Sequence, residues 1–170
     1  MYRMQISTGE WLEIKMHPLF LVPLTIVVDQ VSKLIIRFNM NRGESLEVIG
    51  QFFQLTYIHN PGAAFGFNLG SPLIHTVISV VALFFLIYIY RNFEEEEVSG
   101  RYGISLVLGG AIGNIIDRIY LGEVVDFFDV GLGSYRWPIF NFADSFVTVG
   151  VFVLIFIHSS GDKQDLRDSD

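Results

Sequence analysis

The chain has no cysteine, and this absence excludes several kinds of site at once. It rules out a disulfide framework, thiolate metal ligands, cysteine-ligated iron–sulfur clusters and a cysteine nucleophile. Charged residues are also scarce: Asp, Glu, Lys and Arg make up 17% of the 170 residues, whereas a soluble domain carries about 25%. Hydrophobic residues reach 51%. The composition therefore favours a membrane protein over a soluble domain.

Positive charge is in short supply as well, since the formal net charge is −7. This balance removes any whole-molecule attraction for nucleic acid phosphates, so we expect no nucleic acid partner. Much of the acidity is peripheral. Residues 94–97 are four consecutive glutamates, and the C-terminal tail 161–170 holds four aspartates. The rest of the chain is nearly neutral and very apolar, which suits a lipid environment.

Four segments have the character of membrane-spanning helices, which need about 20 mostly apolar residues. The clearest contains no Asp, Glu, Lys or Arg, and the others carry polar residues near one end. A soluble core helix is the alternative for the two weaker segments, the first and the third. We expect a membrane all-α bundle of four transmembrane helices, over residues 18–36, 72–90, 102–118 and 137–158.

The N-terminal stretch lacks the features of a cleaved signal peptide. Glu10 and Glu13 precede the first apolar run, and no small-residue cleavage site follows it. We therefore expect a retained first span. Four spans place both termini on one side, and the loops on that side carry more Lys and Arg, which predicts cytoplasmic termini.

The segments between the spans indicate one domain over residues 1–170, without repeats. In the outer segment 39–71, residues 51–58 are rich in β-formers, and His59-Asn60-Pro61-Gly62 is a turn signal. This pattern predicts a small β-structure on the outer face.

Polar residues within the spans converge at one depth. Odd spans end, and even spans begin, on the side opposite the termini, so residues at these ends meet there. Asp29 and Lys33 are four residues apart and share a helix face, so they can pair. Glycines in the third span, at 109, 110 and 113, would let a neighbouring helix approach closely. The residues expected to meet are Asp29, Lys33, Asn114, Asp117, Arg118, Asn141 and Asp144, with Asp126 and Asp129 of the outer loop 121–136 on the same side.

Two of these acids have no basic neighbour in the sequence. Asp29 and Asp117 each lie near a base and can be structural ion pairs, whereas Asp126 and Asp144 lack one. Two unpaired carboxyls close together in a dry environment share a proton. One can then take a proton from water while the other donates to a carbonyl oxygen. This pair predicts aspartic protease chemistry.

Other functions fit less well. The sequence has no HExxH metal motif, no GxSxG elbow, no Walker loop and no GxGxxG. A proton-coupled transporter or channel would need carboxylates spread across the membrane depth, whereas these gather at one side. A non-enzymatic scaffold, in which acids only pair with bases, does not account for Asp126 and Asp144. The four histidines are dispersed, at His17, His59, His75 and His158.

Five sequence blocks stand in order along most of the chain. They are DQVSK at 29–33, NPGAAF at 60–65, GGAIGNIIDR at 109–118, VDF at 125–127 and FNFADS at 140–145. A single DQxxK is a weak signal, but five blocks on a four-span topology are specific. With these blocks the chain resembles the lipoprotein signal peptidases, also called signal peptidase II, a family of membrane aspartic peptidases of bacteria.

The resemblance implies a function and a set of site residues. It implies cleavage of a prolipoprotein just before its diacylglyceryl-modified cysteine, with Asp126 and Asp144 as the catalytic dyad. It also implies a bacterial inner-membrane location, a β-cradle on the outer leaflet, contact with membrane lipid, inhibition by the cyclic peptide globomycin, and no metal or cofactor. We further expect a monomer. The expected supporting and substrate-binding residues are Asp29, Lys33, Asn60, Gly62, Asn114, Asp117, Arg118 and Asn141.

Overall fold

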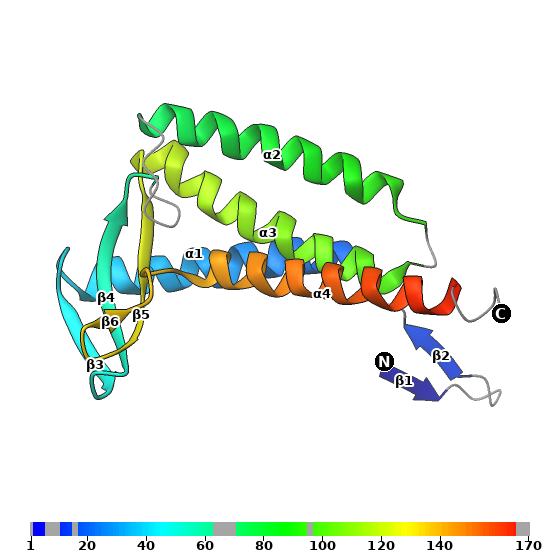
Figure 1. The fold of residues 1–170 in the computed structure, drawn as a ribbon, viewed down its shortest axis with the longest axis horizontal. Helices are drawn as coiled ribbons and strands as arrows, with labels where there is room; N and C mark the ends of the chain where they lie inside the picture. The colour runs from blue at the N-terminus through cyan, green and yellow to red at the C-terminus, as the bar shows by residue number, and fades with distance from the viewer. Residues whose placement is uncertain (1, 6–10, 15–16, 63–70, 95–96, 166–170) are drawn as a thin grey trace.

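The computed structural model describes residues 2–5, 11–14, 17–62, 71–94 and 97–165. Its helices run side by side, and a small sheet lies at one end of them (Figure 1). The hairpin β1–β2 and the C-terminal end of α4 lie at the other end. The helices are η1 (Pro18–Phe20), α1 (Leu21–Asn39), α2 (Pro72–Asn92), α3 (Val98–Leu121) and α4 (Phe142–Asp165). The strands are β1 (Tyr2–Gln5), β2 (Trp11–Ile14), β3 (Ser45–Ile49), β4 (Phe53–Asn60), β5 (Val124–Leu132) and β6 (Tyr135–Arg136).

Local sequence explains where these helices begin and end. Pro18 opens the first helical segment, and its N-cap, His17, accepts a hydrogen bond from the Leu19 N–H. Pro72 likewise lies at the start of α2, although its N-cap, Ser71, makes no side-chain capping hydrogen bond. Helix α3 ends at Gly122, whose φ of +75° is the left-handed conformation that glycine adopts without strain.

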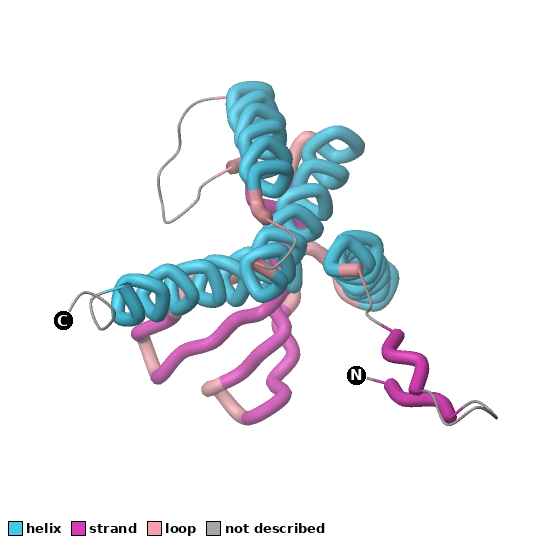
Figure 2. The backbone as a smooth tube through the Cα atoms, turned by 90° about the vertical axis from the view of Figure 1, so that its right-hand side faces the viewer, coloured by secondary structure: helices cyan, strands magenta, loops and turns pink. Residues whose placement is uncertain are grey.

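Helix α3 is the central helix and packs against α1, α2 and α4. Glycines make this possible, because an added Cβ would overlap a neighbouring helix. Gly109 and Gly113 face Thr25 and Asp29 of α1, while Gly110 faces Ala143 of α4. The close approach expected from the glycine spacing is therefore observed. Figure 2 shows the helices in cyan spreading from a common centre.

The outward faces of the helices are apolar and uncovered. The side chains of Phe84, Phe85 and Tyr88 on α2 are well exposed, as are those of Phe152 and Ile155 on α4. Among the described residues, three helical segments, 18–39, 72–92 and 98–121, are long and apolar enough to cross a membrane, and α4 has a shorter apolar portion, 142–156. Together with the fold, these faces identify a multi-pass membrane protein.

The sheet has four antiparallel strands in the order β3-β4-β5-β6. Buried Asp129 of β5 ties its neighbours together: it accepts Arg136 Nε at 2.6 Å and Thr56 Oγ1 at 2.8 Å. Beneath the sheet, Tyr57, Val125 and Phe127 form an apolar cluster with Ile36 of α1. This packing fixes the sheet to the helix ends that carry the polar residues.

Three features differ from the sequence-based expectations. The fourth helix begins at Phe142 instead of residue 137, because residues 137–140 bond alongside β5 through Trp137 N–H and Phe140. The loop 121–136 supplies two strands to the sheet, β5 and β6. Helix α4 also continues into the expected tail, as far as Asp165.

Candidate active site

Asn141 joins Asp126 of β5 to Asp144 of α4. Its Nδ2 donates to Asp126 Oδ1 at 2.7 Å, and its backbone N–H donates to Asp144 Oδ2 at 3.2 Å. In return, Asn141 Oδ1 accepts the backbone N–H of Asp144 at 3.0 Å. Asn141 is completely buried. The structure therefore places the two predicted acids around one shared, fixed side chain.

Asp126 is buried on the sheet and accepts amide donors on both oxygens. The second donor is Asn60 Nδ2 of β4, which lies 3.0 Å from Asp126 Oδ2. Burial raises the pKa of Asp126 to about 7, and the nearby charge of Asp144 adds to the rise. The hydrogen bonds from Asn60 and Asn141 and the charge of Lys33 lower the same pKa. Asp126 is thus able to carry a proton near neutral pH.

Asp144 lies in the first turn of α4, and local capping explains its position. It forms reciprocal hydrogen bonds with Asn141, the residue before the helix, in the manner of a capping box. Asn114 of α3 donates to Asp144 Oδ1 at 2.8 Å. The partial positive charge at a helix N-terminus stabilises a carboxylate there. Asp144 is therefore fixed from α3 and from its own helix.

Lys33 lies at the centre of a buried cluster behind the two acids. Its side chain is 2% exposed, and Nζ contacts Asp29 at 2.8 Å, Asp117 at 2.8 Å and Asn114 Oδ1 at 2.9 Å. An ammonium has three donors, so these three acceptors satisfy it. The sequence places Arg118 beside Asp117, but the structure pairs Asp117 with Lys33. Helical spacing misses this ion pair because it joins α1 to α3.

The same cluster holds the backbone beside each dyad candidate. Asp29 Oδ1 accepts the N–H of Ala143 at 3.0 Å, and Asp117 Oδ2 accepts the N–H of Val125 at 3.1 Å. Gln30 Nε2 contacts Asp29, Asp117 and the Gly113 carbonyl, each at 3.1 Å. Sequence reasoning quoted Gln30 in a motif without assigning it a role.

Two further predicted residues lie at the edge of the site. Arg118 is half-buried, with NH1 3.5 Å from the Asn114 carbonyl, and it interacts electrostatically with Asp126 and Asp144. The Gly62 N–H donates to Asn60 Oδ1 at 3.0 Å. Gly62 has a φ of +123° and lies directly against the His75 ring. All the predicted site residues therefore gather around the sheet end of the helices, while motif residues 63–65 lie outside the described residues.

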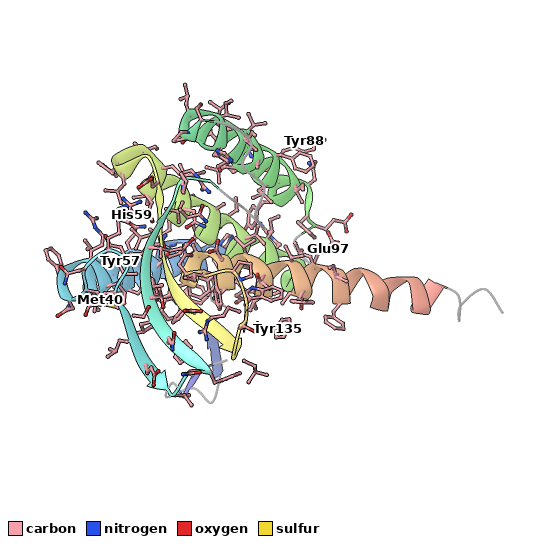
Figure 3. All side chains as sticks on the ribbon, turned by 60° about the vertical axis from the view of Figure 1, so that its left-hand side comes forward. Met40, Tyr57, His59, Tyr88, Glu97 and Tyr135 are labelled. Atoms are coloured by element: carbon pink, nitrogen blue, oxygen red, sulfur yellow. The ribbon has the colours of Figure 1, made fainter. Side chains whose placement is uncertain are left out.

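A second polar cluster, which sequence reasoning did not assign, adjoins Asn60. Tyr57 and His59 of β4 lie near each other (Figure 3). His59 Nε2 is 2.7 Å from the Tyr57 hydroxyl, and His59 Nδ1 is 3.0 Å from Glu123 Oε2. Alternation along the strand could have placed Tyr57 and His59 on one face. Their partner Glu123 follows from the pairing of β4 with β5, which the sequence did not reveal.

Comparison with known proteins gives one consistent result. The family model for signal peptidase (SPase) II matches residues 21–159. The lipoprotein signal peptidase of Syntrophotalea carbinolica is 44% identical over 140 residues, 81% of this chain and 87% of that protein. The one of Moorella thermoacetica is 43% identical over 136 residues, 80% of this chain and 88% of that protein.

Solved structures agree with these relatives. One, described as a bacterial membrane enzyme determined by the in meso method at 2.3 Å resolution, has a TM-score of 0.79 at 35% identity, covering 88% of this chain and 96% of that chain. Another with the same description, at 1.9 Å, has a TM-score of 0.75 at 37% identity, covering 84% and 97%. With its motifs, its fold and these relatives in agreement, the chain belongs to the lipoprotein signal peptidase family, signal peptidase II.

Proposed function

We propose that this chain is a membrane aspartic endopeptidase that removes the signal peptide from prolipoproteins. It cleaves just before the diacylglyceryl-modified cysteine, with Asp126 and Asp144 as the catalytic dyad. Family membership supports the substrate class, since the relatives are named lipoprotein signal peptidases. The choice of these two acids rests on the geometry of the site.

The observation that carries the proposal is the shared contact of Asp126 and Asp144 with buried Asn141. Within the described ranges, no Lys or Arg forms an ion pair with either acid, whereas Asp29 and Asp117 pair with Lys33. Two close carboxyls that form no ion pair favour a state with one proton between them. That state supplies an acid and a base in one place.

The chemistry then follows from this protonation state. Asp144, at the N-terminus of α4, acts as the base: it takes a proton from water as the water oxygen attacks the scissile carbonyl carbon. Protonated Asp126 gives its proton to the carbonyl oxygen, forming a tetrahedral diol. On collapse the carbon–nitrogen bond breaks, Asp144 gives the acquired proton to the leaving nitrogen, and Asp126 regains a proton from a diol hydroxyl. No metal or cofactor enters these steps.

The surrounding residues have supporting roles in this proposal. Asn60, Asn114 and Asn141 hold the carboxyl oxygens in place. Arg118 interacts electrostatically with both acids and can bind a backbone carbonyl of the substrate. The turn at Gly62 lies beside Asn60 and can contact the extended substrate segment.

The location of the site suits a lipid-anchored substrate. The sheet lies at one end of the apolar helices, and β3 presents exposed apolar side chains, Leu46, Val48 and Ile49. We propose that α4 is a fourth span, that the termini are cytoplasmic, and that the sheet rests on the outer leaflet of the bacterial inner membrane. Acyl chains in that leaflet would then fix the distance between the scissile bond and the dyad. We expect the active form to be a monomer.

Cleavage of a defined substrate tests the proposal. Purified full-length protein in detergent should cut a synthetic diacylglyceryl-modified precursor peptide just before the modified cysteine, and globomycin should block the reaction. Asp126→Asn and Asp144→Asn should each abolish turnover while the far-UV circular dichroism and the elution volume stay unchanged. If both variants cleave at near-parent rates, the dyad assignment is wrong.

The same preparation distinguishes the competing function. A proton-coupled transporter would leave the peptide intact and would dissipate a pH gradient in proteoliposomes. The clustering of all these carboxylates at the sheet end of the helices favours the peptidase, because a relay across the bilayer needs acids at several depths.

A further inference from the structure

The end of β4 that carries Asn60 is paired with β5 over only a short length. A β-bulge between Leu55 and Ile58 interrupts the pairing of β4 with β5. Beyond it only three pairs remain, Ile58 with Asp126, His59 with Val125 and Asn60 with Val124. The next residue, Pro61, has no N–H and cannot extend the ladder. The strand end that presents Asn60 to Asp126 therefore needs support from side chains.

His59 and Glu123 supply this support across the last pairs. His59 Nδ1 lies 3.0 Å from Glu123 Oε2, and its Nε2 lies 2.7 Å from the Tyr57 hydroxyl. A neutral imidazole satisfies both contacts when Nδ1–H donates to Glu123 and Nε2 accepts the Tyr57 hydroxyl. Tyr57 is buried in the cluster under the sheet. The imidazole thus links the strand end to a fixed side chain and to the residue that precedes β5.

Glu123 also connects to a third segment. Its Oε2 accepts Arg42 NH2 at 3.2 Å from the turn between α1 and β3, although the Arg42 side chain is 59% exposed. An exposed pair of this kind contributes little to stability. The contact with the less exposed His59 is the one that bears on β4.

We infer that His59 and Glu123 are positioning residues: the Glu123 carboxylate holds the His59 imidazole, and the imidazole keeps Asn60 in register against Asp126. The inference rests on the proposed function, since it assigns a role through the dyad. The hydrogen bonds and ion pairs of these two side chains within the described residues go to Tyr57, to Arg42 and to each other. They act through Asn60, which donates to Asp126 Oδ2 at 3.0 Å.

The pKa of Asp126 distinguishes a positioning role for Glu123 from a purely electrostatic one. The charged groups that act on Asp126 are Asp144 on α4, Lys33 on α1 and Arg118 on α3. Tyr57 and Glu123 contact His59, and Arg42 contacts Glu123. Removing the Glu123 charge would, by Coulomb's law alone, lower the pKa of Asp126. Loss of the Asn60 hydrogen bond raises it, because Asn60 donates to the charged form. The two effects have opposite signs.

The experiment measures the pH dependence of cleavage of the lipidated precursor peptide. Activity should fall on the basic side as the dyad loses its last proton. His59→Leu and Glu123→Ala should move this basic limb upward by about one pH unit, and should lower kcat about tenfold with KM within about twofold. Asn60→Ala should give the same upward shift, since it removes the hydrogen bond itself.

Two matched variants separate position from charge. Glu123→Gln keeps an oxygen that accepts from His59 Nδ1 while it removes the charge. The basic limb of its pH–activity profile should therefore match that of the parent or lie at a slightly lower pH. Arg42→Ala removes only the exposed ion pair and should leave kcat and the limb unchanged. Circular dichroism and thermal unfolding in detergent check that every variant is folded.

A second readout does not depend on turnover. Infrared spectroscopy should show a protonated-carboxyl band that Asp126→Asn removes and whose titration midpoint rises in Glu123→Ala. The inference would be overturned if both His59→Leu and Glu123→Ala kept the infrared titration midpoint and the basic limb of the parent. It would also be overturned if Glu123→Gln shifted the basic limb upward as far as Glu123→Ala does. If the parent does not cleave at all, the proposed function fails, and the infrared midpoint still decides the positioning role.

Discussion

Asp29 on α1 accepts the backbone N–H of Ala143 on α4, with 3.0 Å between Oδ1 and N. Ala143 immediately precedes Asp144, and Asp117 makes the equivalent contact with Val125, which immediately precedes Asp126. One lysine, Lys33, pairs with both of these acids. The two proposed catalytic carboxyls are therefore positioned by a single buried cation, through the backbone.

Replacing Lys33 should destabilise the protein strongly. Lys33→Met leaves two buried carboxylates without their cation, and breaking a buried ion pair in this way costs about 3–5 kcal/mol. Chemical unfolding in detergent should show this loss. Arg37→Met, one turn further along α1 and exposed, is the matched control and should change little. Equal stability of the two variants would contradict a central role for Lys33.

Replacing Asn141 should impair catalysis more than folding. Asn141→Ala releases the shared side chain from both Asp126 and Asp144, so each carboxyl can move by about an ångström, and kcat should fall about 100-fold or more. KM for the lipidated peptide should change little. Thr148→Ala removes a hydrogen bond to the Asp144 carbonyl on the exposed face of α4 and serves as the control with near-parent kcat. A parent-like kcat for Asn141→Ala would refute the bridging role.

Asp126 makes the stability of the protein depend on pH. Its folded pKa of about 7 lies above the ordinary value of 3.8, so the folded state binds the proton more tightly than the unfolded state. The contribution of Asp126 to the free energy of unfolding is therefore greatest below about pH 4. It falls as the pH rises towards 7 and levels off above that pH. The full loss is on the order of 4 kcal/mol.

The Asn variant tests this dependence. Asp126→Asn cannot ionise, so it should be more stable than the parent at pH 8, and the difference should shrink at pH 5. Unfolding midpoints measured across this range check the sign. A difference that grows at low pH would contradict the raised pKa.

The Gly62 turn should not tolerate a side chain. Gly62→Ala places a methyl group against the His75 ring at a φ of +123°, which alanine rarely adopts. The turn must shift, and Asn60 Oδ1 then loses the Gly62 N–H. We expect at least a tenfold loss of kcat, through Asn60 and Asp126. Gly43→Ala is the control, since Gly43 also has a positive φ, of +87°, but nothing within 4 Å of an added Cβ. Equal effects of the two variants would show that backbone strain alone is responsible.

Spacing and depth were enough to predict the convergence of the polar residues. Asp29 and Lys33 share a helix face, and the ends of alternate spans meet on one side, so their clustering follows from topology. The pairing of Asp117 with Lys33 did not follow, because Arg118 is nearer in sequence and only packing across α1 and α3 reveals the true partner.

The sheet was predicted less completely. The β-formers of β4 are clear in the sequence, but β5 lies in a short connection that reads as an apolar loop, and pairing between distant segments has no local signal. Gln30 and Glu123 were missed for the same reason, since their partners lie 64 to 87 residues away. The start of α4 was placed too early because its apolar run begins before the Asn141 cap.

The two carboxyls come from consecutive parts of the chain: Asp126 lies on strand β5, and Asp144 lies in the first turn of α4, which follows the sheet. During biosynthesis the strand emerges first, and Asn141 and Asp144 follow only when the final helix has begun to form. A nascent chain therefore has no complete pair of acids until its synthesis has passed Asp144. For the proposed dyad, this order of synthesis means that a nascent chain is inactive until both acids have been made.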